Sequence, residues 1–281
     1  MVYEFPLTND LLTMTHLLCT VPDREMRGTY GMVINDYRTL AYVEQGMACT
    51  VTELARALDV AKCKASGYVS KLCTRGFIAR KERVGSKVLL ATTEEGSRFA
   101  RESRVFLASV FERMLSPLNQ SQRNLYDMGC TATATMADGF RLVEEAPDFV
   151  YIYLRSCLLT ELFVTKTTRK YRLSLNEFRI LFALLQEKDV LTSSDLMTTL
   201  LLPKATTSDC VQVLRRRGLL GTVSLDGRSK GLSLTLAGRV LAERAACDVD
   251  RSYVQDVRSA QPFERNLYVE VASEIVANAR K

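Results

Sequence analysis

The chain has 281 residues, of which 47% are hydrophobic and 25% charged, and its formal net charge is +6. This composition is that of a soluble globular protein, and the length is enough for two ordinary domains. No apolar run approaches the roughly 18 residues that span a bilayer, and the first residues are unlike a secretory signal, so we expect a cytoplasmic protein without a membrane partner.

Two short helices are predicted after an apolar segment at Pro6–Thr20. Thr50 and Glu53 have the spacing of a helix N-cap, in which a hydroxyl and an acid three residues later satisfy exposed N–H groups. A second helix is predicted over Lys62–Arg75, and Gly76 ends it. Its apolar residues are spaced four and three apart and form one stripe, which leaves a small, polar and basic face exposed, as in a helix-turn-helix.

A β-hairpin and a long helix are predicted next. Phe77–Arg80 and Val88–Thr92 have the composition of strands, and the turn between them contains Gly85. Thr93 and Gly96 then form a Thr-x-x-Gly start to the long helix. The first half of the chain therefore predicts a helix-turn-helix with a basic hairpin behind it.

The second half of the chain follows the same plan. In order it contains an apolar segment at Phe149–Thr165, a cap at Thr192 and Asp195, a helix at Lys204–Arg217 closed by Gly218, strands at Leu219–Thr222 and Leu232–Leu234, and a long helix from about Leu236. Asp is a weaker match than Glu at the third position of the cap.

The two halves are an internal repeat. Arg123–Tyr126 recurs as Arg265–Tyr268, and this spacing of 142 residues holds back to Leu54 and Leu196. Upstream the register shifts by one residue, so that Asn35–Arg38 corresponds to Asn176–Arg179. A register kept over such a length predicts two copies of one domain. We place them at residues 1–142 and 143–281, joined around Gly139–Pro147.

Cysteine and histidine usage argues against disulfides, metal sites and catalysis. The eight cysteines form no CxxC pair, and none align between the repeats. His16 is the only histidine, so no catalytic pair can exist in both copies, and we expect no enzyme, cofactor or metal. The cysteines are interpreted as small hydrophobes. The alternative is a redox role, with Cys73 as candidate because Lys71 and Arg75 favour its thiolate.

Positive charge is concentrated in the same element of both repeats. Eight basic residues face one acid between Ala61 and Lys87, and six face two acids between Pro203 and Lys230. Such clusters on an exposed helix and hairpin indicate nucleic-acid binding. The alternative is that these residues only form solvated helix faces, but this does not explain why both repeats concentrate basic residues in the same helix and hairpin.

The second hairpin resembles the wing of the MarR family of winged-helix regulators. Asp226–Arg228, followed by Leu232–Thr235 and Gly238, is similar to that family's Asp-x-Arg and Leu-x-Leu-Thr-x-x-Gly wing motif. The first repeat keeps the Thr-x-x-Gly part but has Val84–Ser86 in place of the wing Asp and Arg. The resemblance implies a mainly α fold with small β-hairpin wings (α+β), built here as tandem winged helix-turn-helix repeats.

In that family each subunit has one unit and pairs with a second through its terminal helices. Both units are present in this chain, so we expect the flanking helices to pack within it and form a pseudo-dimer. A homodimer of chains is the alternative. The expected function is that of a sequence-specific transcription regulator that binds double-stranded DNA at an asymmetric or pseudo-palindromic operator.

Polar and basic residues on the second helix and the hairpin of each repeat are the predicted DNA contacts. In the first repeat they are Lys62, Lys64, Ser66, Ser70, Lys71, Arg80, Lys81, Arg83 and Lys87. In the second they are Lys204, Thr206, Ser208, Gln212, Arg215, Arg228 and Lys230.

Two further expectations concern partners. The family resemblance implies a small, often aromatic effector or an oxidant. The candidate residues for its pocket are Tyr37, Arg38, Tyr151, Tyr153 and Phe178, and the alternative is that they belong to the core. The rival function is a winged-helix scaffold for protein partners that has lost DNA binding. Asp209 on the second exposed face and the missing wing Asp of the first repeat favour it.

Overall fold

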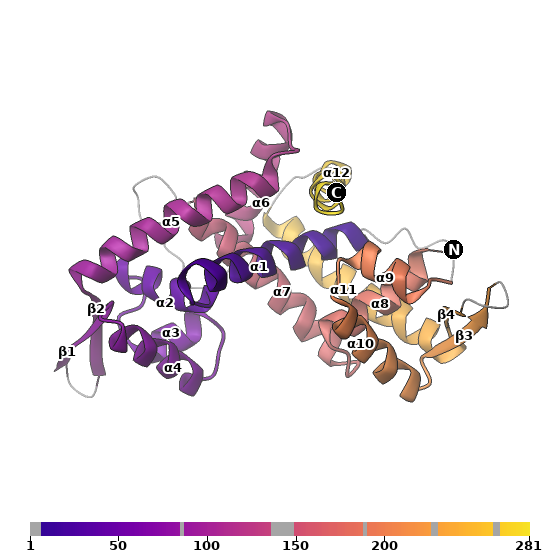
Figure 1. Ribbon diagram of the computed structural model, residues 1–281, viewed down its shortest axis with the longest axis horizontal. Helices are drawn as coiled ribbons and strands as arrows, with labels where there is room; N and C mark the ends of the chain where they lie inside the picture. The colour runs from indigo at the N-terminus through magenta and orange to yellow at the C-terminus, as the bar shows by residue number, and fades with distance from the viewer. Residues whose placement is uncertain (1–6, 85–86, 136–148, 188–189, 226–229, 261–264) are drawn as a thin grey trace. The chain divides into compact units, whose positions relative to one another are not determined.

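The computed structural model describes residues 7–84, 87–135, 149–187, 190–225, 230–260 and 265–281. It is mainly helical with two small antiparallel hairpins, which confirms the predicted fold class (Figure 1). The first half contains α1 Asn9–Tyr30, α2 Ile34–Glu44, α3 Val51–Ala57, α4 Lys62–Thr74, β1 Ile78–Val84, β2 Lys87–Thr92, α5 Glu94–Leu115 and α6 Gln120–Thr135. The second half contains α7 Phe149–Arg169, α8 Leu175–Gln186, α9 Ser193–Leu200, α10 Lys204–Arg216, β3 Leu220–Ser224, β4 Lys230–Leu234, α11 Leu236–Ala260 and α12 Arg265–Ala279.

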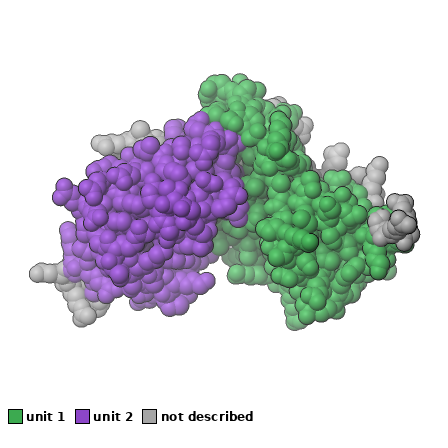
Figure 2. Space-filling model, viewed as in Figure 1, with its two compact units in different colours: residues 1–17, 115–136, 155–281 green, residues 18–114, 137–154 purple. Residues whose placement is uncertain are grey.

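The chain divides into two compact units (Figure 2). Unit 1 comprises residues 1–17, 115–136 and 155–281, and unit 2 comprises residues 18–114 and 137–154. We call α2 to β2 the first head, which lies in unit 2, and α8 to β4 the second head, which lies in unit 1. The predicted boundary after residue 142 and the predicted linker lie outside the described residues.

Each head is a helix-turn-helix whose second helix buries the predicted stripe. The stripe residues are Ala65, Val69 and Leu72 in α4 and Thr207, Val211 and Leu214 in α10, and all are buried. The predicted caps also form. The Thr50 hydroxyl accepts from the Glu53 N–H at 3.2 Å, and the Thr192 hydroxyl accepts from the Asp195 N–H at 3.1 Å. Gly76 adopts a φ of +74° directly after α4, the left-handed conformation that ends a helix.

The Thr-x-x-Gly sequence locks the start of each long helix onto its head. In the first head the Thr93 hydroxyl donates to the Gly76 carbonyl at 2.6 Å and accepts from the Gly96 N–H at 2.9 Å. Thr235 makes the same pair of bonds in the second head, at 2.7 and 3.0 Å. A Cβ on Gly96 would lie 2.0 Å from the Phe77 carbonyl oxygen, so only glycine allows this approach.

The wings differ in length and regularity. β3 and β4 pair in one register, from Leu220 opposite Leu234 to Ser224 opposite Lys230. β1 continues to Val84, beyond the end predicted at Arg80, and its ladder with β2 is irregular between Arg80 and Arg83. The predicted turn was therefore too long. Charged residues can continue a strand of an antiparallel hairpin, because such a hairpin can leave one face in water.

A buried arginine joins each head to the first helix of the other repeat. In unit 2, Arg38 of the first head donates to the Leu154 carbonyl of α7 at 2.8 Å. In unit 1, Arg179 of the second head donates to the Thr13 hydroxyl of α1 at 3.1 Å and to the Leu200 carbonyl at 2.6 Å. The offset of 141 residues that relates Arg38 to Arg179 also relates Thr13 to Leu154, so the two contacts are equivalent across the repeat.

Candidate nucleic-acid interface

The exposed side of α4 carries most of the residues predicted for the first head. Lys62, Lys64 and Ser70 are exposed, and Ser66 is half-buried. Because the apolar stripe of α4 faces the core, these side chains share the outward side of the helix. Its exposed surface is therefore basic and lined by short side chains, as close approach to a phosphate backbone requires.

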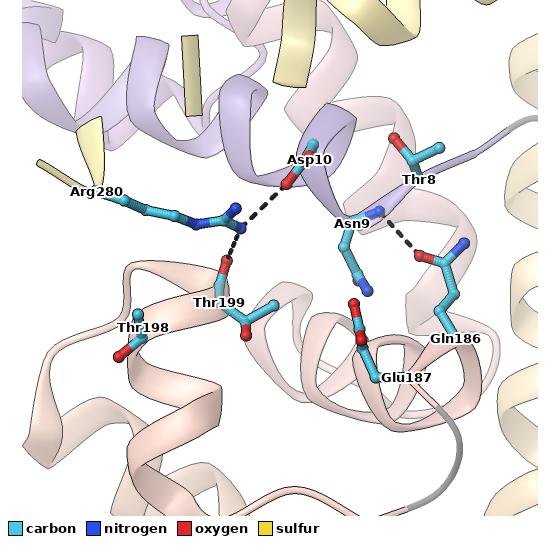
Figure 3. Close-up of a pocket in the computed structure, with 8 residues that line it drawn as sticks. All are labelled: Thr8, Asn9, Asp10, Gln186, Glu187, Thr198, Thr199 and Arg280. Carbon is cyan, nitrogen blue, oxygen red and sulfur yellow. Dashed lines mark hydrogen bonds and ion pairs between the residues drawn. The ribbon is translucent and has the colours of Figure 1, made fainter. Parts of the chain in front are cut away.

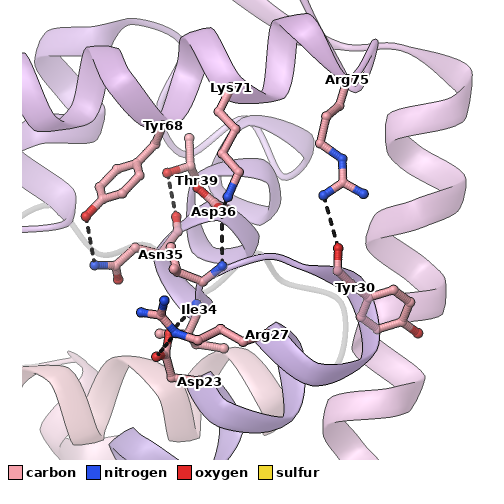
Figure 4. Close-up of polar contacts among 11 residues, drawn as sticks. Asp23, Arg27, Tyr30, Ile34, Asn35, Asp36, Thr39, Tyr68, Lys71 and Arg75 are labelled. Carbon is pink, nitrogen blue, oxygen red and sulfur yellow. Dashed lines mark hydrogen bonds and ion pairs between the residues drawn. The ribbon is translucent and has the colours of Figure 1, made fainter.

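Lys71 differs from the other predicted contacts because it is held by the scaffold. Its ammonium lies 2.5 Å from Oδ2 of Asp36, whose side chain is only 1% exposed. The same carboxylate oxygen accepts from the Val33 N–H at 3.0 Å and so begins α2. A neighbouring bond, from the Asn35 amide to the Tyr68 hydroxyl at 3.3 Å, also joins α2 to α4 (Figure 4). Lys71 thus fixes the exposed helix on α2.

The second head exposes a less basic helix face. Lys204, Ser208, Gln212 and Arg215 on α10 are exposed, and Thr206 is half-buried. Asp209 is exposed on the same helix, and Lys230 is exposed at the start of β4. The two heads therefore present different chemistry on equivalent helices. Both have lysine and serine, but the second also has threonine, glutamine, arginine and an acid.

A side-chain hydrogen bond joins helix to wing in both heads, with donor and acceptor exchanged. In the first head, Arg80 of β1 donates to the Ser70 hydroxyl of α4 at 3.5 Å. In the second head, Arg215 of α10 donates to the Thr222 hydroxyl of β3. Thr222 is the repeat equivalent of Arg80. The link between helix and wing is kept although the arginine has moved from the wing to the helix.

Three predicted wing contacts cannot be placed. Arg228 lies outside the described residues, as do the side chains of Arg83 and Lys87. Lys81 is exposed on β1. The predicted interface is therefore placed for its helices and for the wing residues Arg80, Lys81 and Lys230.

The residues proposed for a ligand pocket are buried in the cores of the two units. Tyr37, Arg38, Tyr151 and Tyr153 belong to unit 2, whereas Phe178 belongs to unit 1. The Tyr151 ring meets that of Tyr42 edge-on at 5.3 Å, and the Tyr153 ring meets that of Phe111 at 5.2 Å. Phe178 stacks on Phe182 of its own helix at 5.6 Å. This placement favours the core interpretation.

The described residues give little support to cysteine reactivity or metal binding. Cys73, the candidate for a redox role, is a free, half-buried thiol on α4. Complete burial raises the pKa of the Cys130 thiol to about 12, which keeps it protonated and unreactive. No group of three or more His, Cys, Asp or Glu in the described ranges is placed to hold a metal ion. No described helix is long and apolar enough to cross a membrane.

The second head also carries a polar cleft that the sequence did not predict. It has a volume of about 330 Å³ and is lined by the start of α1, the end of α8, the end of α9 and Arg280 (Figure 3). Arg280 donates to the Asp10 carboxylate at 3.1 Å and to the Thr199 carbonyl at 2.7 Å. The cleft was missed because its walls come from four segments that are far apart in the sequence.

Comparison with known proteins supports the family resemblance. Residues 173–229, from just before α8 to the second wing, match the MarR family. The predicted resemblance is thereby confirmed for the second repeat. A search of curated proteins found no match.

Several solved structures are similar to about half of the chain. A MarR-family transcriptional regulator from Silicibacter pomeroyi is 24% identical, with 50% of this chain and 96% of that chain covered and a TM-score of 0.40. One from Rhodococcus sp. RHA1 is 17% identical, with 48% and 98% covered and a TM-score of 0.43. The MarR-family protein Rv2887 of Mycobacterium tuberculosis, in complex with salicylic acid, is 21% identical, with 46% and 96% covered and a TM-score of 0.36.

Proposed function

We propose that this chain is a transcription regulator that binds double-stranded DNA through two unlike winged helix-turn-helix heads. The observation that carries the proposal is the pair of helices α4 and α10. Each buries one stripe and exposes a face of short polar and basic side chains. A helix of this kind fits the major groove, where basic side chains bind phosphates and short polar side chains reach base edges.

The two heads are proposed to act as an intrachain pseudo-dimer. Support comes from the equivalent contacts of Arg38 with α7 and of Arg179 with α1. The buried arginine of each head donates to the first helix of the other repeat, so the two contacts are reciprocal. Two identical subunits of a symmetric dimer make such reciprocal contacts, and here a single chain supplies the two equivalent halves.

The operator is proposed to be asymmetric or pseudo-palindromic. Identical heads favour palindromes, because the symmetry of the protein is matched by that of the site. Here Lys64 of the first head corresponds to Thr206 of the second, and Arg80 corresponds to Thr222. Unlike side chains at equivalent positions favour unlike half-sites.

Selection of bound sequences from a random DNA pool tests this function. We expect enrichment of a site with two different half-sites, and footprinting should show both of them protected. Binding should weaken steeply with added salt, because phosphate contacts release counterions. An enriched perfect palindrome with symmetric protection would contradict the asymmetric operator, and the absence of any enriched sequence would contradict the function.

A scaffold for protein partners is the second candidate. The observation that favours it is Asp209, an exposed acid on the outward side of α10, where a carboxylate would repel phosphate. Asp209→Asn separates the candidates. It should strengthen DNA binding by the second head if that head faces phosphate, and it should leave DNA binding unchanged if the head serves a protein partner.

A further inference from the structure

We propose that the cleft of the second head binds a small, polar, amine-bearing molecule that also carries an amide-like hydrogen-bonding group. All the walls of the cleft belong to unit 1, so the site is contained in one compact part of the chain. Its volume of about 330 Å³ is within the range of small-molecule sites. This site is separate from the exposed faces of α4 and α10.

The amide of Asn9 is the first observation that points to a ligand. Asn9 is 6% exposed, yet neither the oxygen nor the nitrogen of its side chain has a hydrogen-bond partner among the described residues. Its backbone N–H, by contrast, donates to the Gln186 side chain at 3.1 Å. A buried amide without partners is costly and rare in native proteins. A ligand that offers one donor and one acceptor would satisfy both atoms.

The charges around the cleft favour a cationic ligand. Arg280 and Asp10 neutralise each other at 3.1 Å, and Ser273 donates to the second carboxylate oxygen of Asp10 at 3.0 Å. Glu187 lines the cleft and forms no ion pair with any described residue, so its charge is available to a ligand. Figure 3 shows its carboxylate and the Asn9 amide pointing toward one another.

Helix geometry strengthens the preference for a cation. Glu187 is the C-cap of α8, and Thr198 and Thr199 lie in the last turn of α9. The C-terminal end of a helix carries partial negative charge on its carbonyl groups, so these two helix ends favour an ammonium group over an anion. The start of α1 carries the opposite partial charge, which the carboxylate of Asp10 in its first turn offsets. The threonine hydroxyls add neutral donors and acceptors.

The first head has no equivalent site among its described residues. The repeat equivalents of Asn9 and Asp10 are Val150 and Tyr151. The C-cap of α2, the position that Glu187 holds on α8, is Gln45. Val150 is 4% exposed, and Tyr151 packs its ring against Tyr42 at 5.3 Å. An apolar side chain thus replaces the Asn9 amide, and a neutral side chain replaces the acid. One site per chain follows.

A consequence for regulation rests on the proposed function. Thr199, whose carbonyl is held by Arg280, precedes the turn at Leu201 that leads into α10. Leu201 has a left-handed φ of 51°, which places this turn in a strained conformation. A ligand that contacts the end of α9 therefore acts on the placement of α10 alone, so it should change DNA binding by the second head and leave the first head unaffected.

Calorimetric titration of the full chain, without DNA, tests the site. The probes are 4-aminobutanamide and 5-aminopentanamide, with butanamide as the neutral control and acetate as the anionic one. We expect saturable binding of the two cationic probes, at least ten-fold tighter than butanamide, and no binding of acetate. Failure of both cationic probes to bind the wild-type chain would overturn the proposal.

Three variants assign the binding to these residues. Glu187→Gln and Asn9→Leu should each weaken the cationic probes at least ten-fold, whereas Glu102→Gln, which removes an exposed acid from α5, should have no effect. Asn9→Leu should also raise the thermal midpoint of the free protein, because an unpartnered buried amide is replaced by an apolar group. Unchanged probe binding in both Glu187→Gln and Asn9→Leu would place the bound molecule elsewhere and refute the assignment.

The regulatory step has its own readout. The calorimetric titration contains no DNA, so it tests the site even if the chain does not bind DNA. With an enriched operator, the probe should alter protection of one half-site only. Equal changes at both half-sites would refute action through a single head.

Discussion

At the scale of single residues, His16 shows how burial sets a protonation state. It lies in the part of α1 that belongs to unit 1. Burial, and then the positive charge of Arg179, lower the pKa of His16 from 6.5 to about 4. Between these pH values the unfolded chain binds a proton that the folded chain does not, so the free energy of unfolding falls as pH decreases.

We expect this loss to reach about 3 kcal/mol between pH 7 and pH 4, since one pKa unit corresponds to about 1.4 kcal/mol. His16→Gln should remove that part of the dependence. Urea unfolding of both proteins at pH 7, 5.5 and 4.5 measures the difference. Parallel pH profiles for the two proteins would show that His16 does not carry the effect.

Gly96 and Gly238 are the second test at this scale. Gly96→Ala places a methyl group 2.0 Å from the Phe77 carbonyl, and Gly238→Ala does the same at Leu219. Backbone must shift in both cases, so we expect each change to lower the free energy of unfolding by about 1–3 kcal/mol. Gly28→Ala is the matched control, because nothing lies within 4 Å of the new methyl group in α1. It should raise stability by up to about 1 kcal/mol.

At the scale of elements, the join between α2 and α4 depends on Lys71. Lys71→Met leaves the buried carboxylate of Asp36 without its cation, which we expect to cost about 1–3 kcal/mol. The lower part of this range allows for the 42% exposure of the lysine side chain. Asp36→Asn in the same chain should recover part of the loss, whereas Lys62→Met alone should stay within about 0.5 kcal/mol. Thermal unfolding of the three variants and the unaltered protein measures these differences.

The exposed face of α4 makes a prediction about salt. If Lys62 and Lys64 each neutralise one phosphate, replacing both by alanine reduces the slope of log binding constant against log salt by about 2. Arg101→Ala, on the exposed surface of α5, should leave the slope unchanged. Fluorescence anisotropy with an enriched operator over a range of salt concentrations gives the slopes. An unchanged slope for the double variant would remove these lysines from the interface.

At the scale of the whole molecule, the reciprocal contacts of Arg38 and Arg179 lead to a prediction about mass. An intrachain pseudo-dimer should scatter light as a particle near 31.6 kDa. Its unfolding midpoint should not depend on protein concentration, because no second chain has to dissociate. A mass near twice this value, or a midpoint that rises with concentration, would favour the homodimer instead.

The sequence by itself determined the elements of each head. The stripe of Val69 and Leu72, the cap at Thr50 and the stop at Gly76 were predictable because each depends on residues within a turn or two of one helix. The repeat of these signals also predicted that the second half of the chain would build the same head. Local spacing is sufficient for such features, since helix period and cap geometry do not depend on the rest of the fold.

Only the tertiary structure decided how these elements use their charges. Lys71 had the pattern of a DNA contact, but packing of α4 on α2 brings it to Asp36, 35 residues away. The cleft at Asn9 likewise exists only because α1 meets the ends of α8 and α9, at a separation of 177 residues from Asn9 to Gln186. Sequence patterns show which side of a helix is polar. The partner that a polar group finds depends on which distant segment the fold packs against it.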